Sequence, residues 1–157
     1  MIFSGPEIVT ELTQLGISHV IWIPDSDLGR WEADLEASSV ELVRVCREGE
    51  AWPLAAGLLV GGKTPLIMIQ TTGLFESGDA LRNVIHDLRL PVFAIIGARN
   101  YLNADSKDSA KTFGEPILKT WDIDYLVVAS PSDRPKLREH YVRCRAENRP
   151  GAILLAE

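Results

Sequence analysis

The stretch VELVRVCREGEAWPLAAG, residues 40–57, joins a short strand to a helix and places a carboxylate between them. Residues 40–45 alternate and are rich in β-branched side chains, which predicts a strand. Apolar residues then recur at 51, 54, 55, 58 and 59, which is helical spacing. Because Pro53 has no N–H, it fits only in the first turn, so the helix should begin near Gly49 or Glu50. Glu48 is therefore expected at the carboxyl end of a strand, where open α/β sheets bind ligands.

The alternation of strand and helix continues along the whole chain. Strands are expected near residues 18–23, 40–45, 65–70, 91–96, 124–128 and 151–155, and helices near 4–15, 27–37, 49–61, 76–88, 112–121 and 132–147. Ser4 and Glu7 should form a capping box at the first helix. Residues 99–111 are polar and have the length of a lid, so this segment should be the least ordered. The pattern predicts an α/β fold with a single doubly wound, mostly parallel six-stranded sheet and helices on both faces.

The bulk composition narrows the class of protein. A chain of 157 residues that is 46% hydrophobic and 24% charged is expected to fold as one globular domain. The net charge of −6 argues against nucleic acid as a partner. We expect a cytoplasmic protein, because neither a signal peptide nor an apolar run of membrane length is found. Cys46 and Cys144 are too far apart for a metal or redox motif and are expected to be free, buried thiols.

Residues 57–64, GLLVGGKT, match the phosphate-loop pattern G-x-x-x-x-G-K-[ST]. That loop must follow a strand and open a helix, because the N–H groups at the helix start bind the phosphates. Here the glycines close a helix, and Pro65 leads into a strand. Gly61 and Gly62 are therefore predicted to be a helix C-cap and turn, which excludes nucleotide hydrolysis.

Three segments in order resemble thiamine diphosphate enzymes. The family motif Glu-x-x-Ala-x-x-x-Ala-x-Gly of the pyrimidine-binding (PYR) domain is matched by Glu48, Ala51, Ala55 and Gly57. Residues 20–28, VIWIPDSDL, resemble the Val-Pro-Asp-Ser-x-Leu segment of phosphonopyruvate decarboxylases. Residues 63–74, KTPLIMIQTTGL, resemble their Lys-x-Pro-strand-Gln-Asn-Ser-Gly-Leu. The resemblance runs from near residue 8 to the C-terminus, and the chain length is similar to that of the sulfopyruvate decarboxylase α subunit. It implies that residues 1–157 form a single PYR domain.

The resemblance implies a catalytic role for Glu48. Its carboxyl group would bond the pyrimidine nitrogen N1′ of thiamine diphosphate and favour the imino form of the 4′-amino group, which deprotonates the thiazolium carbon. The chain would thus be the α subunit of a thiamine diphosphate-dependent 2-oxoacid decarboxylase. Position alone favours a solvated carboxylate stabilised by the helix dipole, because such carboxylates are common at helix starts, and the resemblance reverses that preference.

The same resemblance assigns other residues at the strand ends. Thr71, Thr72 and Gly73 would bind the cofactor, with a helix N-cap as the alternative. Asp25 and Ser26 would contact the substrate, with a turn and N-cap as the alternative. Arg99 would pair with an anionic head group of the substrate, whereas lone arginines at strand ends are usually solvated.

The chain also departs from the family. The family's Asn-Ser-Gly-Leu-Gly-Asn is replaced by TTGLFE at residues 71–76, so that Phe75 and Glu76 enter the expected pocket. The Glu76 carboxylate would repel a phosphonate or sulfonate unless Arg99, Lys107 or Lys111 offset its charge.

A motif that anchors the diphosphate is missing as well. The family binds the diphosphate and Mg²⁺ through a Gly-Asp-Gly…Asn motif, which this sequence lacks. A diphosphate-binding (β) subunit is therefore expected as partner in a hetero-oligomer, with Mg²⁺ held by that subunit and self-association of this chain possible. The alternatives are a non-catalytic PYR-domain homologue that acts as a structural or regulatory partner, and a flavodoxin-like small-molecule binding module.

Overall fold

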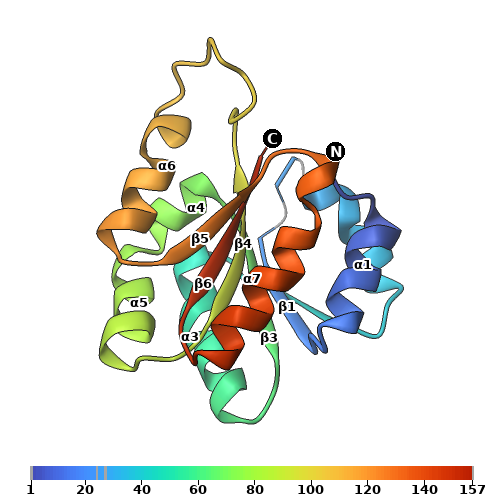
Figure 1. Ribbon diagram of the computed structural model, residues 1–157. Helices are drawn as coiled ribbons and strands as arrows, with labels where there is room; N and C mark the ends of the chain where they lie inside the picture. The colour runs from blue at the N-terminus through green and yellow to red at the C-terminus, as the bar shows by residue number, and fades with distance from the viewer. Residues whose placement is uncertain (1, 24, 27, 157) are drawn as a thin grey trace.

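The computed structural model describes residues 2–23, 25–26 and 28–156, and within them one sheet of six strands runs through the molecule (Figure 1). The strand order is β2-β1-β3-β4-β6-β5, and every pairing is parallel. The strands are β1 (His19–Trp22), β2 (Glu41–Arg44), β3 (Pro65–Gln70), β4 (Phe93–Ala98), β5 (Asp124–Val128) and β6 (Gly151–Ala156). The predicted α/β fold is confirmed, and the strand positions agree with the sequence pattern to within two residues.

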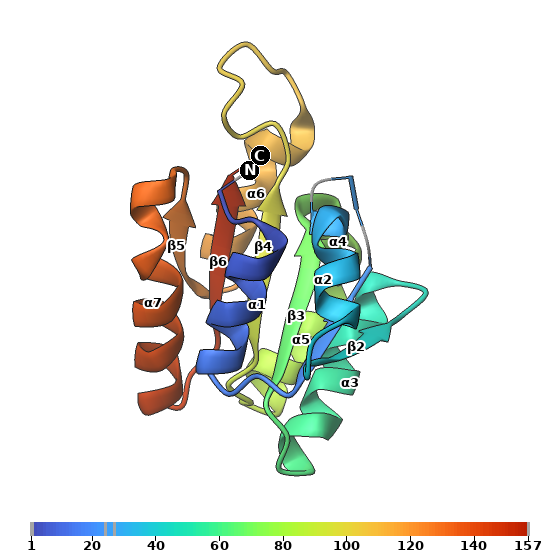
Figure 2. The same ribbon diagram turned by 90° about the vertical axis from the view of Figure 1, so that its right-hand side faces the viewer.

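Helices cover both faces of this sheet (Figures 1 and 2). One face carries α1 (Gly5–Gln14), the turn η1 (Leu28–Trp31), α2 (Glu32–Glu36) and α7 (Pro135–Ala146), which follows the turn η3 (Pro131–Asp133). The other face carries α3 (Glu48–Val60), α4 (Thr71–Glu76), α5 (Gly78–Arg82), the π-helical turn η2 (Asn83–Asp87) and α6 (Ser109–Thr120).

The core consists of two apolar layers, one on each face of the sheet. Along β1, Val20 and Trp22 pack against the layer of α1 and α7, and Ile21 packs against the layer of α3 and α6. The inner strands β1, β3, β4 and β6 are almost wholly buried, and the edge strands β2 and β5 are partly exposed. The continuous apolar runs of the inner strands follow from this two-sided cover.

The strand order reverses direction between β1 and β3. From β1 the chain crosses outward to β2, and from β2 it returns to pair β3 with the other side of β1. Ligands of open α/β sheets bind at such a reversal, beyond the carboxyl ends of the strands. The segments after β1, β2 and β3 all reach this edge, and the loop of residues 99–108 stands above it (Figure 1).

Some boundaries and one cysteine differ from the sequence expectation. The helix expected at 76–88 begins at Thr71, directly after β3, and is divided into α4, α5 and η2. At the first of these junctions, the Ser77 hydroxyl bonds the main-chain oxygen of Gly73 at 2.7 Å. Cys46 is exposed rather than buried, because it follows the edge strand β2, whereas Cys144 is buried.

Other local predictions are confirmed. The Ser4 main-chain N–H donates to the Glu7 carboxylate at 2.7 Å, as the capping box requires. Gly61 is the C-cap of α3 and Gly62 has a φ of +76°, so the phosphate-loop pattern closes a helix. Pro24 of the quoted segment and Asp27, the expected start of the second helix, lie outside the described residues. None of the described helices has the length and apolar character needed to cross a membrane.

Candidate functional site

Glu48 is the first residue of α3 and is half-buried at the carboxyl edge of the sheet. Its side chain lies directly on Gly73 of α4, since a Cβ on Gly73 would be 2.4 Å from the Glu48 Cγ. Within the described residues, the Glu48 carboxylate has neither a hydrogen-bond nor an ion-pair partner. A carboxylate that is held against a helix and has no partner can bond a ligand.

Two other glutamates accept hydrogen bonds from the main-chain N–H groups at the start of α3. The Glu50 carboxylate accepts from the N–H groups of Cys46 and Arg47 at 2.9 and 3.3 Å. The Glu76 carboxylate accepts from the Gly49 N–H at 2.6 Å and from the Arg47 Nε at 3.0 Å. The charge of Glu76 is thus offset by Arg47, and not by Arg99, Lys107 or Lys111 as the sequence suggested.

The residues after β3 point in different directions. Gly73 is buried beneath Glu48, and Thr72 is exposed at the same helix start, with its hydroxyl 3.4 Å from the Gln70 Oε1. Thr71 is only 2% exposed and faces α6, where a Cβ on Gly114 would be 3.1 Å from its Cγ2. The strand end therefore brings Gly73 against Glu48, leaves Thr72 exposed, and packs Thr71 under α6.

Arg99 lies on the α6 side of this edge. It is exposed just after β4, and its Nε is 3.0 Å from the Asp108 carboxylate. Hydrogen bonds from the Ala110 N–H and the Asn100 side chain, together with Arg99, lower the pKa of Asp108. Arg99 also borders a cavity of about 10 Å³ beside the buried Thr71 hydroxyl, which has no hydrogen-bond partner among the described residues. The arginine expected to bind an anion thus has a carboxylate partner within the chain.

Asp25 and Ser26 lie on the segment between β1 and η1. The Asp25 Oδ1 accepts from the Leu28 N–H at 2.8 Å, and its main-chain oxygen accepts from Gly29 at 3.1 Å. Ser26 is exposed. Asp25 therefore acts as a cap of η1, which is the local alternative that the sequence offered for this segment.

The loop of residues 99–108 is attached to α6 by a tyrosine. The Tyr101 hydroxyl bonds Glu115 at 3.2 Å, and the Tyr125 hydroxyl bonds the other oxygen of Glu115 at 2.5 Å. Burial, followed by the charge and hydrogen bond of Glu115, raises the pKa of Tyr101, and burial and Glu115 also raise that of Tyr125. Both phenols are thus neutral donors to one carboxylate. The segment expected to be least ordered is braced at Asp108 and at Glu115.

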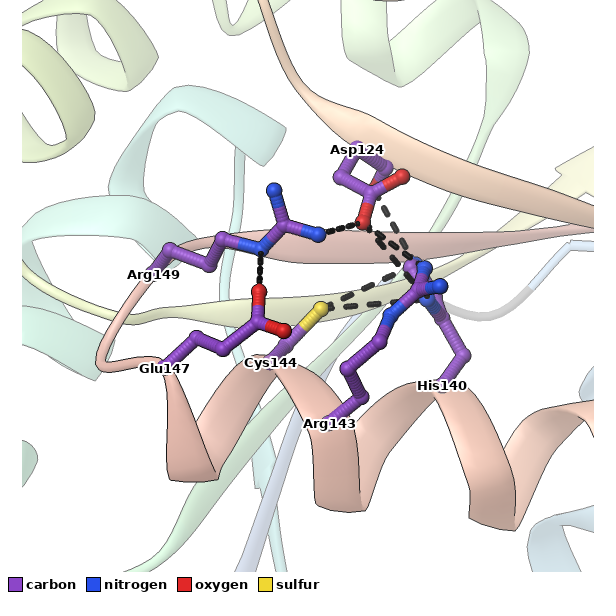
Figure 3. Close-up of polar contacts among 6 residues, drawn as sticks. All are labelled: Asp124, His140, Arg143, Cys144, Glu147 and Arg149. Carbon is purple, nitrogen blue, oxygen red and sulfur yellow. Dashed lines mark hydrogen bonds and ion pairs between the residues drawn. The ribbon is translucent and has the colours of Figure 1, made fainter.

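A second polar cluster, at the amino end of β5, escaped the sequence prediction (Figure 3). The possible ligand atoms of Asp124, His140 and Cys144 all lie within 4.8 Å of one another. His140 and Cys144 are one turn apart on α7, and this spacing was the available signal. Asp124 could not be foreseen, because it comes from a different element.

This cluster is already satisfied by arginines. An Arg143 Nη2 lies 2.8 Å from both the Asp124 Oδ2 and the His140 Nδ1, and Arg149 also pairs with Asp124. The His140 Nε2 bonds the main-chain oxygen of Asp124 at 3.1 Å. Burial lowers the pKa of His140 and raises that of Cys144, so imidazole and thiol are neutral. Because arginine guanidinium groups already bond the Asp124 carboxylate and the His140 ring, we interpret this cluster as structural.

Comparison with known proteins was made by sequence and by structure. No protein-family model matches the chain. Phosphonopyruvate decarboxylase of Streptomyces viridochromogenes is 25% identical over 144 residues, which are 89% of this chain and 36% of that protein. 1-Deoxy-D-xylulose-5-phosphate synthase of Pasteurella multocida is 31% identical over 109 residues, which are 68% of this chain and 17% of the synthase. The chain is related to a domain of thiamine diphosphate enzymes.

The fold also agrees with that of a solved structure. Benzoylformate decarboxylase from Polynucleobacter necessarius superposes with a TM-score of 0.71 at 21% identity. The match covers 98% of this chain and 29% of that chain. The domain described here therefore spans only about a third or less of the proteins that it matches.

Proposed function

We propose that this chain is the pyrimidine-binding α subunit of a thiamine diphosphate-dependent 2-oxoacid decarboxylase, of the sulfopyruvate or phosphonopyruvate type. The observation that carries the proposal is the unpartnered Glu48 carboxylate, fixed on Gly73 at the carboxyl edge of the sheet. Similarity to a phosphonopyruvate decarboxylase over 89% of the chain supports it. In this proposal, residues 1–157 form one PYR domain.

The residues around Glu48 fit the pyrimidine end of the cofactor. When bound, thiamine diphosphate supplies the electron sink for loss of carbon dioxide from a 2-oxoacid. Glu48 would hold a proton between its carboxyl group and the ring nitrogen N1′, for which its freedom from other partners suits it. Gly73 leaves no side chain between α4 and Glu48, and Thr72 is exposed beside it to bond the aminopyrimidine.

The substrate side of the site would be formed by Asp25, Ser26 and Arg99. Arg99 is exposed, so its guanidinium can exchange Asp108 for the anionic head group of a substrate. Thr71 would not face the cofactor, because its side chain is buried under α6. We expect it to order the start of α4 rather than to touch the cofactor.

A partner subunit is part of the proposal. Exposed apolar side chains lie along α3 and α4, namely Leu54, Val60 and Phe75, and Val60, at the far end of α3 from Glu48, is 77% exposed. Next to them an apolar groove of about 610 Å³ runs between α3 and η2. Such a surface indicates a covering protein. A diphosphate-binding β subunit would hold the diphosphate and Mg²⁺, because this sequence lacks the Gly-Asp-Gly…Asn motif.

One observation favours a non-catalytic PYR-domain homologue as a second candidate. Asp25 and Arg99, two of the expected substrate contacts, already have partners within the chain. A homologue that only stabilises or regulates a partner enzyme would retain the fold and the apolar surface without using Glu48.

The experiment that tests the proposal is decarboxylation by this chain co-expressed with a diphosphate-binding subunit encoded beside it. The assay contains thiamine diphosphate, Mg²⁺ and a panel of 2-oxoacids that includes sulfopyruvate and phosphonopyruvate. Activity should need both chains and be lost in Glu48→Gln. The matched control is Glu139→Gln, an exposed carboxylate of α7 on the other face of the sheet. If the complex does not depend on thiamine diphosphate for decarboxylation, or if Glu48→Gln has full activity, the proposal is rejected in favour of the non-catalytic homologue.

A further inference from the structure

Helices α3 and α4 meet through two reciprocal contacts between a glutamate and a glycine. Glu48 of α3 lies on Gly73 of α4, where a Cβ would be 2.7 Å from the Glu48 Oε1. In return, Glu76 of α4 lies on Gly49 of α3, where a Cβ would be 3.2 Å from the Glu76 Oε2. Gly73 and Glu76 are one turn apart and so share the face of α4 that meets α3. Each helix thus offers a glycine to the carboxylate of the other.

The two carboxylates differ in their partners. Glu76 accepts from the Gly49 N–H at 2.6 Å and from the Nε and Nη2 of Arg47 at 3.0 and 2.8 Å. These partners are the residues on either side of Glu48. The Glu48 carboxylate has no such bonds among the residues that the structure describes. Glu76 is therefore hydrogen-bonded to both residues that flank Glu48, and its bond to the Gly49 N–H holds the backbone next to Glu48.

We propose that Glu76 is a positioning residue that directs the Glu48 side chain. The inference rests on the proposed function, in which Glu48 acts on the cofactor. The first N–H groups of a helix have no partner within it, and a carboxylate that accepts from one of them makes a strong, charge-assisted bond. By accepting from the main-chain N–H of Gly49, Glu76 restricts the backbone next to Glu48, and the Glu48 side chain then packs against Gly73.

The hydrogen bond from the Gly49 N–H to Glu76 contributes most to the positioning of Glu48. The Arg47 side chain is 71% exposed, so its ion pair with Glu76 contributes little to stability by itself. Its effect is electrostatic, because it offsets the charge of Glu76 beside the second carboxylate. Without Arg47, the Glu76 charge would have no cationic partner among the described residues.

The first test measures this chain alone by nuclear magnetic resonance. In Glu76→Ala, exchange of the Gly49 amide proton should accelerate about tenfold, as expected when a hydrogen bond of ordinary strength is lost. Three-bond couplings should show the Glu48 χ1 averaged over several rotamers. Glu76→Gln keeps an oxygen acceptor and should remain near wild type, as should the matched control Asp79→Ala. Unchanged Gly49 exchange and an unchanged Glu48 χ1 in Glu76→Ala would overturn the inference.

The second test uses the complex with the diphosphate-binding subunit. Glu76→Ala should lower kcat about tenfold with KM for the 2-oxoacid within about twofold, and Glu76→Gln should restore most of kcat. A wild-type kcat in Glu76→Ala, despite faster Gly49 exchange, would make Glu76 a helix cap only and refute the positioning role. Failure of the proposed function gives a different result: activity that is absent in wild type or survives Glu48→Gln. The Gly49 exchange and Glu48 χ1 data, which need no cofactor, then decide whether Glu76 orients Glu48.

Discussion

The two ends of the sheet carry charged clusters of opposite character. At the amino end of β5, Asp124 contacts two arginines and both ring nitrogens of His140 are bonded (Figure 3). At the carboxyl edge, Glu76 is saturated and Glu48 has no partner within the described chain. The first cluster has more potential metal ligands, but every charge in it is compensated. We propose function for the Glu48 cluster, because its carboxylate has no partner among the described residues and lies at the carboxyl edge, where open α/β sheets bind ligands.

The largest expected effect is that of Glu48→Gln on activity. The substitution removes the proton-holding group and should lower kcat of the complex at least about 100-fold, the usual contribution of a general acid or base. Because Glu48 has no partner to lose, the free energy of unfolding should change by less than about 1 kcal/mol. The measurements are steady-state kinetics and urea unfolding. A large loss of stability would show that Glu48 is structural, like Asp124.

Gly73→Ala should damage the same site through packing. The new Cβ would lie 2.4 Å from the Glu48 Cγ, so the glutamate or the α3–α4 contact must move. We expect kcat to fall by about 10-fold or more and the free energy of unfolding by about 1–3 kcal/mol.

Gly78→Ala is the matched control for this change. Gly78 is also helical. Apart from its own helix and chain neighbours, no atom lies within 4 Å of the position of an added Cβ. The kcat and the free energy of unfolding should therefore stay near wild type. Normal activity of Gly73→Ala would mean that Glu48 does not need its present position.

Asp124→Ala should lower the free energy of unfolding and leave kcat unchanged, which is the opposite of the effect expected for Glu48→Gln. It leaves Arg143 and Arg149 without their shared carboxylate, whose side chain is 27% exposed. Hydrogen bonds to charged groups contribute about 1.5–3 kcal/mol, and partial exposure places the expected loss near 2 kcal/mol. Urea unfolding measures it, and kcat of the folded complex should be unchanged. A loss of activity at full stability would contradict the structural role of this cluster.

The sequence predicts the fold well because local signals and burial agree. The apolar runs of β3, β4 and β6 and the turn at Gly61 and Gly62 each point to the observed element. The expected helix at 76–88 fails at its start, because Thr71 and Thr72 are poor helix formers in isolation. In the structure the extended Gln70 precedes them as an N-cap, and Thr71 is packed under α6. Tertiary contact decides that boundary.

The candidate site is predicted less completely than the fold. The position of Glu48 after a strand follows from residues 40–57 alone. The saturation of Glu76 by Arg47 and Gly49 depends on how α4 meets α3, which no local pattern encodes. The same holds for Asp124, which joins His140 and Cys144 only after β5 packs against α7. The sequence thus predicts which side chains reach an edge, but not which of them become paired there.

The smallest expected effect is a pH dependence of stability caused by His140. Its side chain is fully buried, and this burial, with the charges of Arg143 and Arg149, lowers its pKa against the opposing effect of Asp124. In the unfolded chain the pKa is near 6.5, so below that pH the unfolded state binds a proton that the native state does not. Stability is therefore full above about pH 6.5 and falls as the pH drops toward the lower native pKa, by at most about 1.4 kcal/mol per pH unit.

Urea unfolding at pH 7.5 and 5.5 isolates this contribution. The pKa values of Glu7, Asp108 and Asp133 are all lowered from values already below this window, so these hydrogen-bonded carboxylates stay ionised throughout it. His140→Gln should lose less stability than wild type between the two pH values, by about 1 kcal/mol. Equal pH dependence in wild type and His140→Gln would mean that His140 accepts a proton in the folded cluster. The arginine-filled arrangement at Asp124 would then have to open at pH 5.5, and the contrast with the Glu48 site would lose its basis.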